Sequence, residues 1–332
     1  MDPLRIEVLQ TAVGYWLSKA LHCAAKADVA DRLEAGPRHV DELARAAGVH
    51  PESLFRILRA LASVGIFAET DPGVFALTPK AQYLRTKHPA SVRHFAEMIA
   101  DDLFDAWVDI DHAVATGASA VSRRFGQDFF ARIADDPRKV RVFDQAMQEI
   151  HGGETELMLA AYDFARHAKV LDVGGGNGST LAGLLQAHPQ LVGAVFDLPQ
   201  VVANAREQLT AVPGFAGRVE FHAGDFFQRV DGRADCLVLR HVLHDWDDAR
   251  CVTILENCRA ALEPGGRILI VEKVLQPGNQ PEFVKLLDLN MMAIGGKERS
   301  RAQYEALLAA CGLHLVEAHT TPGPVDVIEV SA

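Results

Sequence analysis

The chain has 332 residues, 49% of them hydrophobic, and a formal net charge of −11 at pH 7. This length and composition allow two domains, each with a buried core. The acidic balance disfavours general binding to nucleic acid or to anionic membranes, so we expect a small-molecule partner, no nucleic acid and no membrane.

The cysteines and the N-terminal segment predict the compartment. The five cysteines include no CxxC pair, which indicates reduced thiols and neither a disulfide framework nor a zinc site. The first ten residues, MDPLRIEVLQ, lack the apolar core of a signal peptide, and no window reaches the roughly 18 uninterrupted apolar residues of a membrane span. We therefore expect a cytoplasmic protein.

Residues 1–100 are predicted to form a helical domain that contains a winged helix. Apolar residues recur at helical spacing over residues 14–33. The following segment predicts a short helix, a turn at Gly48, a second helix with Pro51 in its first turn, and a hairpin that folds at residues 71–73. Helix, turn, helix and a two-stranded wing in this order describe a winged helix.

A winged helix leaves two functions open, DNA binding and dimerisation. Residues 31–60 contain five arginines and five acids, whereas a helix that binds DNA has a basic face. The first helical segment carries several large apolar side chains, namely Tyr15, Trp16, Leu17 and Leu21. They exceed what the core of so small a domain needs, which favours a homodimer over a transcriptional regulator.

In the rest of the chain, the predicted secondary structure changes near residue 168. Residues 101–167 predict helices of mixed polarity, expected to act as a linker and to line a substrate pocket. Residues 168–332 alternate helical segments with short apolar runs at 168–176, 191–199, 218–227, 234–241 and 266–274. Strands that alternate with helices predict an α/β fold with a doubly wound, Rossmann-like parallel sheet.

The sequence VLDVGGGNGST places Gly174, Gly176 and Gly178 between a predicted strand and a predicted helix. Glycines at such a turn let a ligand approach the backbone, and the helix start offers free N–H groups. The dinucleotide pattern GxGxxG is not met, because Ser179 stands at its third glycine position. On this motif alone, a tight turn without a ligand remains an alternative.

The next two predicted strands end in acids. Asp197 follows Gly174 by 23 residues, where a carboxylate can accept both hydroxyls of a ribose. Asp225 can accept from an exocyclic amine, while the adjacent Phe226 can cover a purine ring. Each acid alone is more often a helix cap. Three consecutive strand ends with such groups make capping the weaker explanation.

The motifs LDVGGGNG, FDLP, GDFF, HDWDD and GGKERS, in this order and behind a winged helix, resemble one enzyme family. It comprises the S-adenosylmethionine-dependent small-molecule O-methyltransferases of the caffeate and acetylserotonin type, including bacterial enzymes that tailor natural products. The resemblance covers essentially the whole chain. It implies S-adenosylmethionine as the cofactor, a small aromatic acceptor and a homodimer. The cofactor-site residues it implies are Gly174, Gly176, Asp197, Asp225, Phe226 and Arg240.

The stretch LRHVLHDWDD contains His241 and His244. A metal site is disfavoured, since neither further ligands nor a HExxH motif appear. We expect His241 to be a packing residue and Asp247 to cap the following helix. The resemblance implies that His244 is the general base. A phenol with a pKa of about 10 is mostly protonated at neutral pH, and a neutral imidazole can remove that proton.

The resemblance also implies two glutamates beside the catalytic imidazole. Glu272 ends the fifth predicted strand, and Glu298 lies in GGKERS. A carboxylate bonded to one imidazole nitrogen fixes the tautomer and favours the imidazolium. Without the resemblance, Glu298 would be interpreted as a surface residue in a Lys-Glu-Arg cluster. Asp245 either positions the ring or is solvated.

Acceptor contacts are predicted only from positions within the family pattern. The candidates are Met147, His151, Asn290 and Met291, although a helical methionine is more often a core residue. The segment between Asp288 and Gly295 is shorter than in plant members, so no plant substrate is carried over. Some relatives bind S-adenosylmethionine and perform hydroxylation, decarboxylation or cyclisation, and the presence of His244 argues against that alternative.

Overall fold

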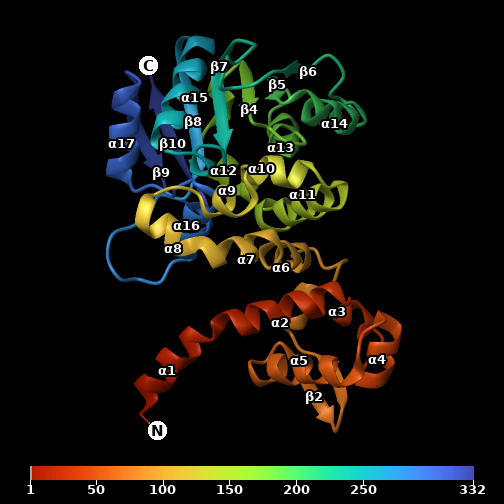
Figure 1. The fold of residues 1–332 in the computed structure, drawn as a ribbon. Coiled ribbons are helices and arrows are strands. Elements are labelled where there is room, and N and C mark those ends of the chain that lie inside the picture. The colour runs from red at the N-terminus through yellow and green to blue at the C-terminus, as the bar shows by residue number, and fades with distance from the viewer. Residues whose placement is uncertain (1) are drawn as a thin grey trace. The chain divides into compact units, whose positions relative to one another are not determined.

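The computed structural model describes residues 2–332, which form two compact units (Figure 1). The first unit contains the residues up to 111 and residues 121–152, and the second contains residues 112–120 and 153–332. The predicted segment 101–167 is therefore shared between the units, and the three-part division of the chain stays a prediction. No helix within residues 2–332 is long and apolar enough to cross a membrane.

The first unit begins with the predicted winged helix. Its helices are α1 (Pro3–Ala12), α2 (Gly14–Lys26), α3 (Val29–Arg32), α4 (Val40–Ala47) and α5 (Pro51–Ser63). The wing consists of β2 (Phe67–Asp71) and β3 (Val74–Leu77), and β1 (Arg38–His39) adds a third strand that the sequence did not predict. The hairpin turns at Gly73, whose φ of +76° suits a glycine. Gly48 ends α4 in the same left-handed region.

The core of this domain follows from the spacing of its apolar residues. Leu54, Leu58 and Leu61 lie on one face of α5 and are buried together with Phe67 and Phe75. A different group of apolar side chains, on α1 and at the start of α2, stays exposed. Tyr15 and Trp16 are 55% and 59% exposed, and α1 buries no residue.

Further helices follow the winged helix in the chain. They are α6 (Arg93–Ile99), α7 (Asp102–Ala106), α8 (Ile110–Thr116), α9 (Ala120–Phe125), α10 (Phe129–Ala134) and α11 (Pro137–His151). Glu149 of α11 accepts hydrogen bonds from the amides of His94 and Phe95 at the start of α6, at 2.8 and 3.1 Å. It thereby supplies acceptors for the free N–H groups of a helix that has no capping side chain of its own.

The second unit contains a seven-stranded sheet in the order β6-β5-β4-β7-β8-β10-β9. The strands are β4 (Lys169–Val173), β5 (Val192–Asp197), β6 (Val219–Ala223), β7 (Ala234–Arg240), β8 (Leu262–Glu272), β9 (His314–His319) and β10 (Asp326–Ser331). The first five are parallel and coincide with the five predicted runs. The antiparallel strands β9 and β10 were not predicted.

Helices cover both faces of this sheet, as the doubly wound prediction requires (Figure 1). They are α12 (Glu154–Ala161), α13 (Ser179–Ala187), α14 (Pro199–Thr210), α15 (Asp248–Ala261) and α17 (Arg301–Ala310). A further helix of this unit, α16 (Phe283–Ile294), follows β8 in the chain. Leu171 packs with residues of α15 and α17, while its neighbour Val170 packs with residues of α12, α13 and α14. Successive side chains of a strand point to opposite faces, so a strand covered on both faces, such as β4, is mostly apolar.

Strand β4 has β5 on one side and β7 on the other. The order of the strands therefore reverses between β4 and β7. In an open α/β sheet, ligands bind outside the carboxyl ends of the strands at such a reversal. The segments that follow β4, β5, β6 and β7 are the ones that carry the candidate cofactor residues and His244.

Candidate active site

The glycine loop after β4 has a backbone that only glycine adopts without strain. Gly174, Gly176 and Gly178 have φ values of +70°, +57° and +79°. A Cβ atom at Gly174 would lie 2.8 Å from Cγ2 of Val242, so the loop lies directly against the segment that follows β7. The glycines thus allow the backbone conformation of the turn, and they also let the loop backbone lie close to the segment after β7.

Asp197, at the end of β5, is bonded to this loop. Its Oδ2 accepts a hydrogen bond from the amide of Gly176 at 2.9 Å, and its Oδ1 accepts from the amide of Leu198 at 2.7 Å. Helix α14 has no side-chain cap, so Asp197 is not the helix cap that was its alternative interpretation. Burial raises the pKa of Asp197, while the two amides lower it. Each oxygen keeps a lone pair for a further donor.

Asp225 and Phe226 follow β6. Oδ1 of Asp225 accepts from the amide of Phe227 at 2.8 Å, which closes a local turn and leaves the second oxygen outside that bond. Cε1 of Phe226 lies 3.8 Å from the position of a Cβ at Gly174, so the ring stands beside the glycine loop. The structure therefore brings the residues after the first and third parallel strands together.

A third acid in this region was not identified from the sequence. Asp172 of β4 is 1% exposed, and its Oδ2 has no hydrogen-bond partner among residues 2–332. Burial raises its pKa to about 7, the positive charge of Arg240 lowers it, and Asp197 raises it further. A buried carboxylate oxygen without a donor is unfavourable, so this position suits a ligand that brings a donor or a cation. Its sequence signal is an acid inside an otherwise apolar strand.

Arg240 ends β7 and approaches a buried glutamate of α12. Nη1 of Arg240 lies 3.6 Å from Oε2 of Glu154, and Nε2 of His241 lies 2.8 Å from the same oxygen. His241 has a φ of +53°, a conformation that is uncommon outside glycine. His241 was expected only to pack, but it is partly exposed and hydrogen-bonded, so a polar contact replaces the predicted apolar one.

His244 lies in the short 3₁₀ helix η4 (Leu243–Asp245) and is 7% exposed. Its Nδ1 lies 2.8 Å from Oε1 of Glu298, which is 2% exposed. The interpretation of Glu298 as a surface residue is therefore wrong. Nε2 of His244 lies 3.6 Å from Oδ1 of Asp245, a largely buried side chain, so Asp245 faces the ring. The absence of a metal site stays a prediction.

Glu272 also contacts His244, but not through the ring. Oε1 of Glu272 accepts a hydrogen bond from the main-chain amide of His244 at 3.0 Å, and Oε2 accepts one from the hydroxyl of Tyr304. Glu272 and Tyr304 are both fully buried. Glu298 thus holds the imidazole, whereas Glu272 holds the backbone that carries it.

The three carboxylates determine the charge on His244. Burial alone would lower its pKa, but Asp245, Glu298 and Glu272 together raise it to about 10. Burial in turn raises the pKa of Asp245 to about 7 and also raises that of Glu298. A carboxylate only accepts hydrogen bonds, so Nδ1 of His244 carries a proton towards Glu298 and Nε2 is the nitrogen that can exchange one.

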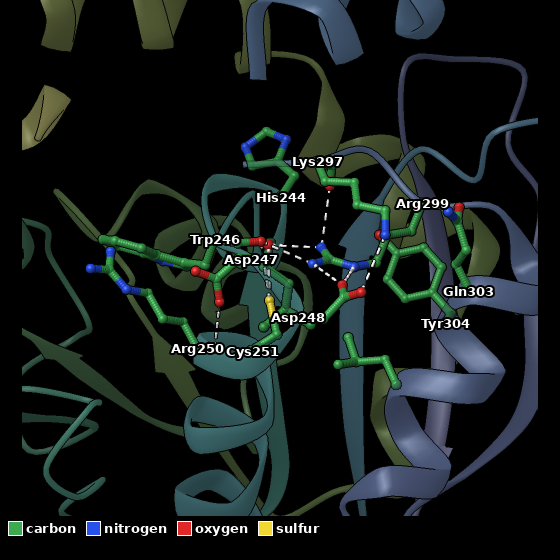
Figure 2. A network of polar contacts seen from close by, with 12 residues as sticks. His244, Trp246, Asp247, Asp248, Arg250, Cys251, Lys297, Arg299, Gln303 and Tyr304 are labelled. Atoms are coloured by element: carbon green, nitrogen blue, oxygen red, sulfur yellow. Dashed lines mark hydrogen bonds and ion pairs between the residues drawn. The ribbon is translucent and has the colours of Figure 1, made fainter. Parts of the chain in front are cut away.

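The segment GGKERS lies along η4 and brings Glu298 to the ring. The amide of Lys297 donates to the carbonyl of His244 at 2.7 Å, and the amide of Glu298 donates to Asp288 at 2.8 Å. A Cβ at Gly296 would come within 2.1 Å of the His244 carbonyl, so no larger residue fits there. The same segment carries Arg299, whose contacts Figure 2 shows. Asp247 caps α15 through the amide of Arg250, as predicted.

The four predicted acceptor residues lie on two helices. Met147 and His151 belong to α11, and Asn290 and Met291 belong to α16. Met291 is 6% exposed, and its side chain lies in the interior. Their role in acceptor binding stays a prediction.

Comparison with known proteins agrees with this geometry. A family model described as the O-methyltransferase domain matches residues 107–314, and one described as the O-methyltransferase dimerisation domain matches residues 9–87. The chain belongs to the O-methyltransferase family. The resemblance inferred from the motifs, the α/β fold and the N-terminal dimerisation domain are thereby confirmed.

Relatives of this O-methyltransferase match along nearly all of its length. A phenazine O-methyltransferase of Lysobacter antibioticus is 38% identical over 328 residues, which cover 98% of this chain and 96% of that protein. The crystal structure of an O-methyltransferase from neocarzinostatin biosynthesis, in complex with S-adenosylmethionine and 2-hydroxy-5-methyl naphthoic acid, is 36% identical with a TM-score of 0.85 and covers 95% of each chain. The aclacinomycin 10-hydroxylase of Streptomyces purpurascens is 34% identical over 328 residues, 94% of this chain and 87% of that protein. The enzyme is accordingly an S-adenosylmethionine-dependent O-methyltransferase.

Proposed function

We propose that this enzyme methylates a phenolic hydroxyl of a small, multi-ring aromatic acceptor, and that His244 receives the hydroxyl proton. The hydrogen bond between His244 and the buried Glu298 carries the proposal, because it orients a ring nitrogen next to the carboxyl ends of the strands. The acceptor class is supported by the relatives, which include a phenazine enzyme and one bound to a naphthoic acid.

The cofactor site that we propose uses the strand ends. When bound, S-adenosylmethionine supplies an electrophilic methyl group on a sulfonium. Asp197 would accept the ribose hydroxyls, and Asp225 and Phe226 would hold the adenine, while Gly174 and Gly176 let the ligand approach the backbone. Arg240 would complete the lining of the site. The unpaired buried oxygen of Asp172 supports the fit, since the cofactor carries an ammonium group that can donate to a carboxylate.

The proposed proton transfer follows from the charges at His244. A phenol and an imidazolium whose pKa values both lie near 10 exchange a proton at little cost in free energy. The carboxylate of Glu298 stabilises the imidazolium that results and keeps the ring in one tautomer. Because the pKa of His244 is raised, the fraction of His244 in the neutral, proton-accepting form still increases at pH values well above 7. Turnover should increase with it over the same pH range.

Hydroxylation, decarboxylation or cyclisation of the acceptor is a second candidate function, because one relative is named as a hydroxylase. The test is to incubate the enzyme with methyl-labelled S-adenosylmethionine and a panel of phenols, naphthols, quinones and phenazines, followed by mass analysis. Label in an ether product supports the proposal. An acceptor that gains oxygen or loses carbon dioxide without label would favour the second candidate, and label on nitrogen or carbon would overturn hydroxyl methylation.

We also propose that the enzyme acts in the cytoplasm. All five of its cysteines are free thiols, and four of them are buried. Free thiols in this number suit a reducing compartment. Fractionation of the native cells should recover the methyltransferase activity with the cytoplasmic contents, and recovery with an exported fraction would contradict the proposal.

A further inference from the structure

Arg299 is a fully buried arginine in the second unit, at 0% exposure. A buried cation is unfavourable unless it is paired and hydrogen-bonded on most sides. The partners of the guanidinium therefore indicate what the side chain does. Figure 2 shows that they converge on the turn that carries His244.

The guanidinium of Arg299 connects both ends of that turn. Nη1 donates to the carbonyl of Leu243 and Nη2 to the carbonyl of Trp246, each at 2.9 Å. Leu243 and Trp246 directly flank the pair His244-Asp245. Nε and Nη2 also bond Oδ1 of Asp248, at 3.0 and 2.7 Å, which fixes the plane of the guanidinium.

Other groups act on the same carbonyls. The amide of Lys297 bonds the carbonyl of His244, between the two that Arg299 holds. Cys251 of α15 donates a hydrogen bond from its Sγ to the carbonyl of Leu243, at 3.2 Å (Figure 2). The turn is thus fixed mainly through its carbonyl groups. Cys251 also reaches the carbonyl of Trp246, at 3.5 Å, but Arg299 is the charged side chain that bonds both ends.

We propose that Arg299 is a positioning residue for catalysis, whose guanidinium holds the turn Leu243–Trp246 so that His244 meets the acceptor hydroxyl. This inference rests on the proposed role of His244. A planar guanidinium can bond two carbonyls and a carboxylate at once, whereas the ammonium of lysine is a compact group that cannot span them. Loss of the guanidinium should let the imidazole of His244 move, and a misplacement of about 1 Å can lower the rate roughly 100-fold.

The main test is the variant Arg299→Lys, which keeps the positive charge and removes the planar guanidinium that bonds several acceptors at once. We expect kcat to fall roughly 10- to 100-fold, while the KM for the acceptor and the Kd for S-adenosylmethionine stay within about threefold. The acceptor is the phenol that the labelled-methyl panel identifies. A kcat equal to that of the wild type in the folded variant would overturn the proposal.

Arg218 offers a matched control in the same unit. Its guanidinium also holds main-chain carbonyls, those of Leu185, His188 and Leu191, but at the amino ends of the strands. Arg218→Lys should lower the Tm by an amount similar to Arg299→Lys and leave kcat unchanged. An equal loss of kcat in both variants would mean that Arg299 acts only through general stability, against the proposal.

A double variant separates positioning from other effects. In a His244→Ala background, Arg299→Lys should cause no further loss of kcat, since no base is left to position. Additive losses would overturn the positioning role. If His244→Ala alone leaves turnover of a phenol unchanged, the base proposal fails. If His244→Ala lowers turnover but Arg299→Lys does not, only the Arg299 proposal fails.

Two measurements cover the case in which Arg299→Lys does not fold. Asp248 is 58% exposed in its side chain, so Asp248→Ala should fold, release one side of the guanidinium and lower kcat roughly three- to tenfold. Unchanged kcat in this folded variant would contradict the proposal. Proton NMR needs no acceptor: the Nδ1 proton of His244, assigned by its absence in His244→Ala, should be downfield in the wild type and should broaden or move upfield in Asp248→Ala.

Discussion

Oε1 of Glu272 accepts a hydrogen bond from the main-chain amide of His244 at 3.0 Å, whereas Glu298 bonds the imidazole of the same residue at 2.8 Å. The two glutamates therefore act on different parts of one histidine. Replacing Glu298 removes a charge and the ring contact, while replacing Glu272 removes a charge and a backbone anchor.

This difference predicts how the pKa of His244 responds to each variant. The three carboxylates raise that pKa to about 10, so removing one of them must lower it. Glu298→Gln should give the larger decrease, because it also removes a charge-assisted hydrogen bond to the imidazolium. NMR titration of labelled histidine measures both values, with His244→Ala for assignment. An equal or larger decrease in Glu272→Gln would contradict the assignment of Glu298 to the ring.

The same shift fixes the sign of the pH dependence of turnover. Only neutral His244 accepts a proton, so kcat/KM should rise with pH until about pH 10 in the wild type. In Glu298→Gln the rising limb should move to lower pH, and its plateau should be lower because the ring loses its orientation. A phenol with a pKa of about 10 also ionises in this range, so both variants should be measured with the same acceptor, and the displacement of the limb in Glu298→Gln assigns the limb to His244. A profile that is flat above pH 7 would mean that proton transfer to His244 does not limit the reaction.

Asp197 should determine cofactor affinity. Asp197→Ala removes an acceptor for two ribose hydroxyls, so binding of S-adenosylmethionine should weaken by about 1.5–3 kcal/mol, measured by titration calorimetry. Asp235→Ala is the matched control, because Asp235 also accepts from two main-chain amides, at 3.0 and 2.7 Å, but at the amino end of β7. Affinity equal to the wild type in Asp197→Ala, or an equal loss in the control, would remove Asp197 from the ribose site.

Much of the sheet could be predicted because its parallel strands are buried on both faces. Such strands are mostly apolar runs, and β4, β5, β7 and β8 were found in this way, whereas β6 is a partly exposed edge strand with a weaker pattern. β9 has an exposed and mixed burial pattern at the sheet edge, and β1 has two residues, so neither gives a clear signal. Strand ends in a parallel sheet share one edge, which is why Asp197 could be proposed from its place in the chain, whereas the role of His244 was implied by the family resemblance.

The contacts around His244 could not be predicted in the same way. Glu298 is 54 residues away from it, and the contact depends on how the chain returns after α16. In the string Lys-Glu-Arg, charge patterning predicts a solvated surface, yet Glu298 and Arg299 are buried. Only the family resemblance pointed to Glu298, and no sequence signal pointed to Arg299 or to Tyr304. Their burial is a property of the tertiary fold.

The dimerisation domain predicts the mass of the enzyme in solution. Light scattering at micromolar concentration should give about 72 kDa, twice the 36.1 kDa of one chain. Trp16→Glu places a charge on an apolar side chain that is 59% exposed, so it should shift the enzyme towards monomer without unfolding it. Glu7→Lys, on the polar part of α1, is the control for a change of charge. A monomer mass for the wild type would contradict the homodimer.

The last prediction concerns acceptor acidity. If His244 is the base, His244→Ala should lower turnover of a phenol roughly 10²- to 10⁴-fold and leave the Kd of S-adenosylmethionine nearly unchanged. The defect should shrink for acceptors whose hydroxyl is already ionised, because a phenolate needs no base. A series of phenols with pKa values from about 6 to 10 should therefore show a mutant defect that grows with acceptor pKa. A defect that is the same for all acceptors would mean that His244 shapes the site without accepting the proton, and that proximity of the bound reactants provides most of the rate.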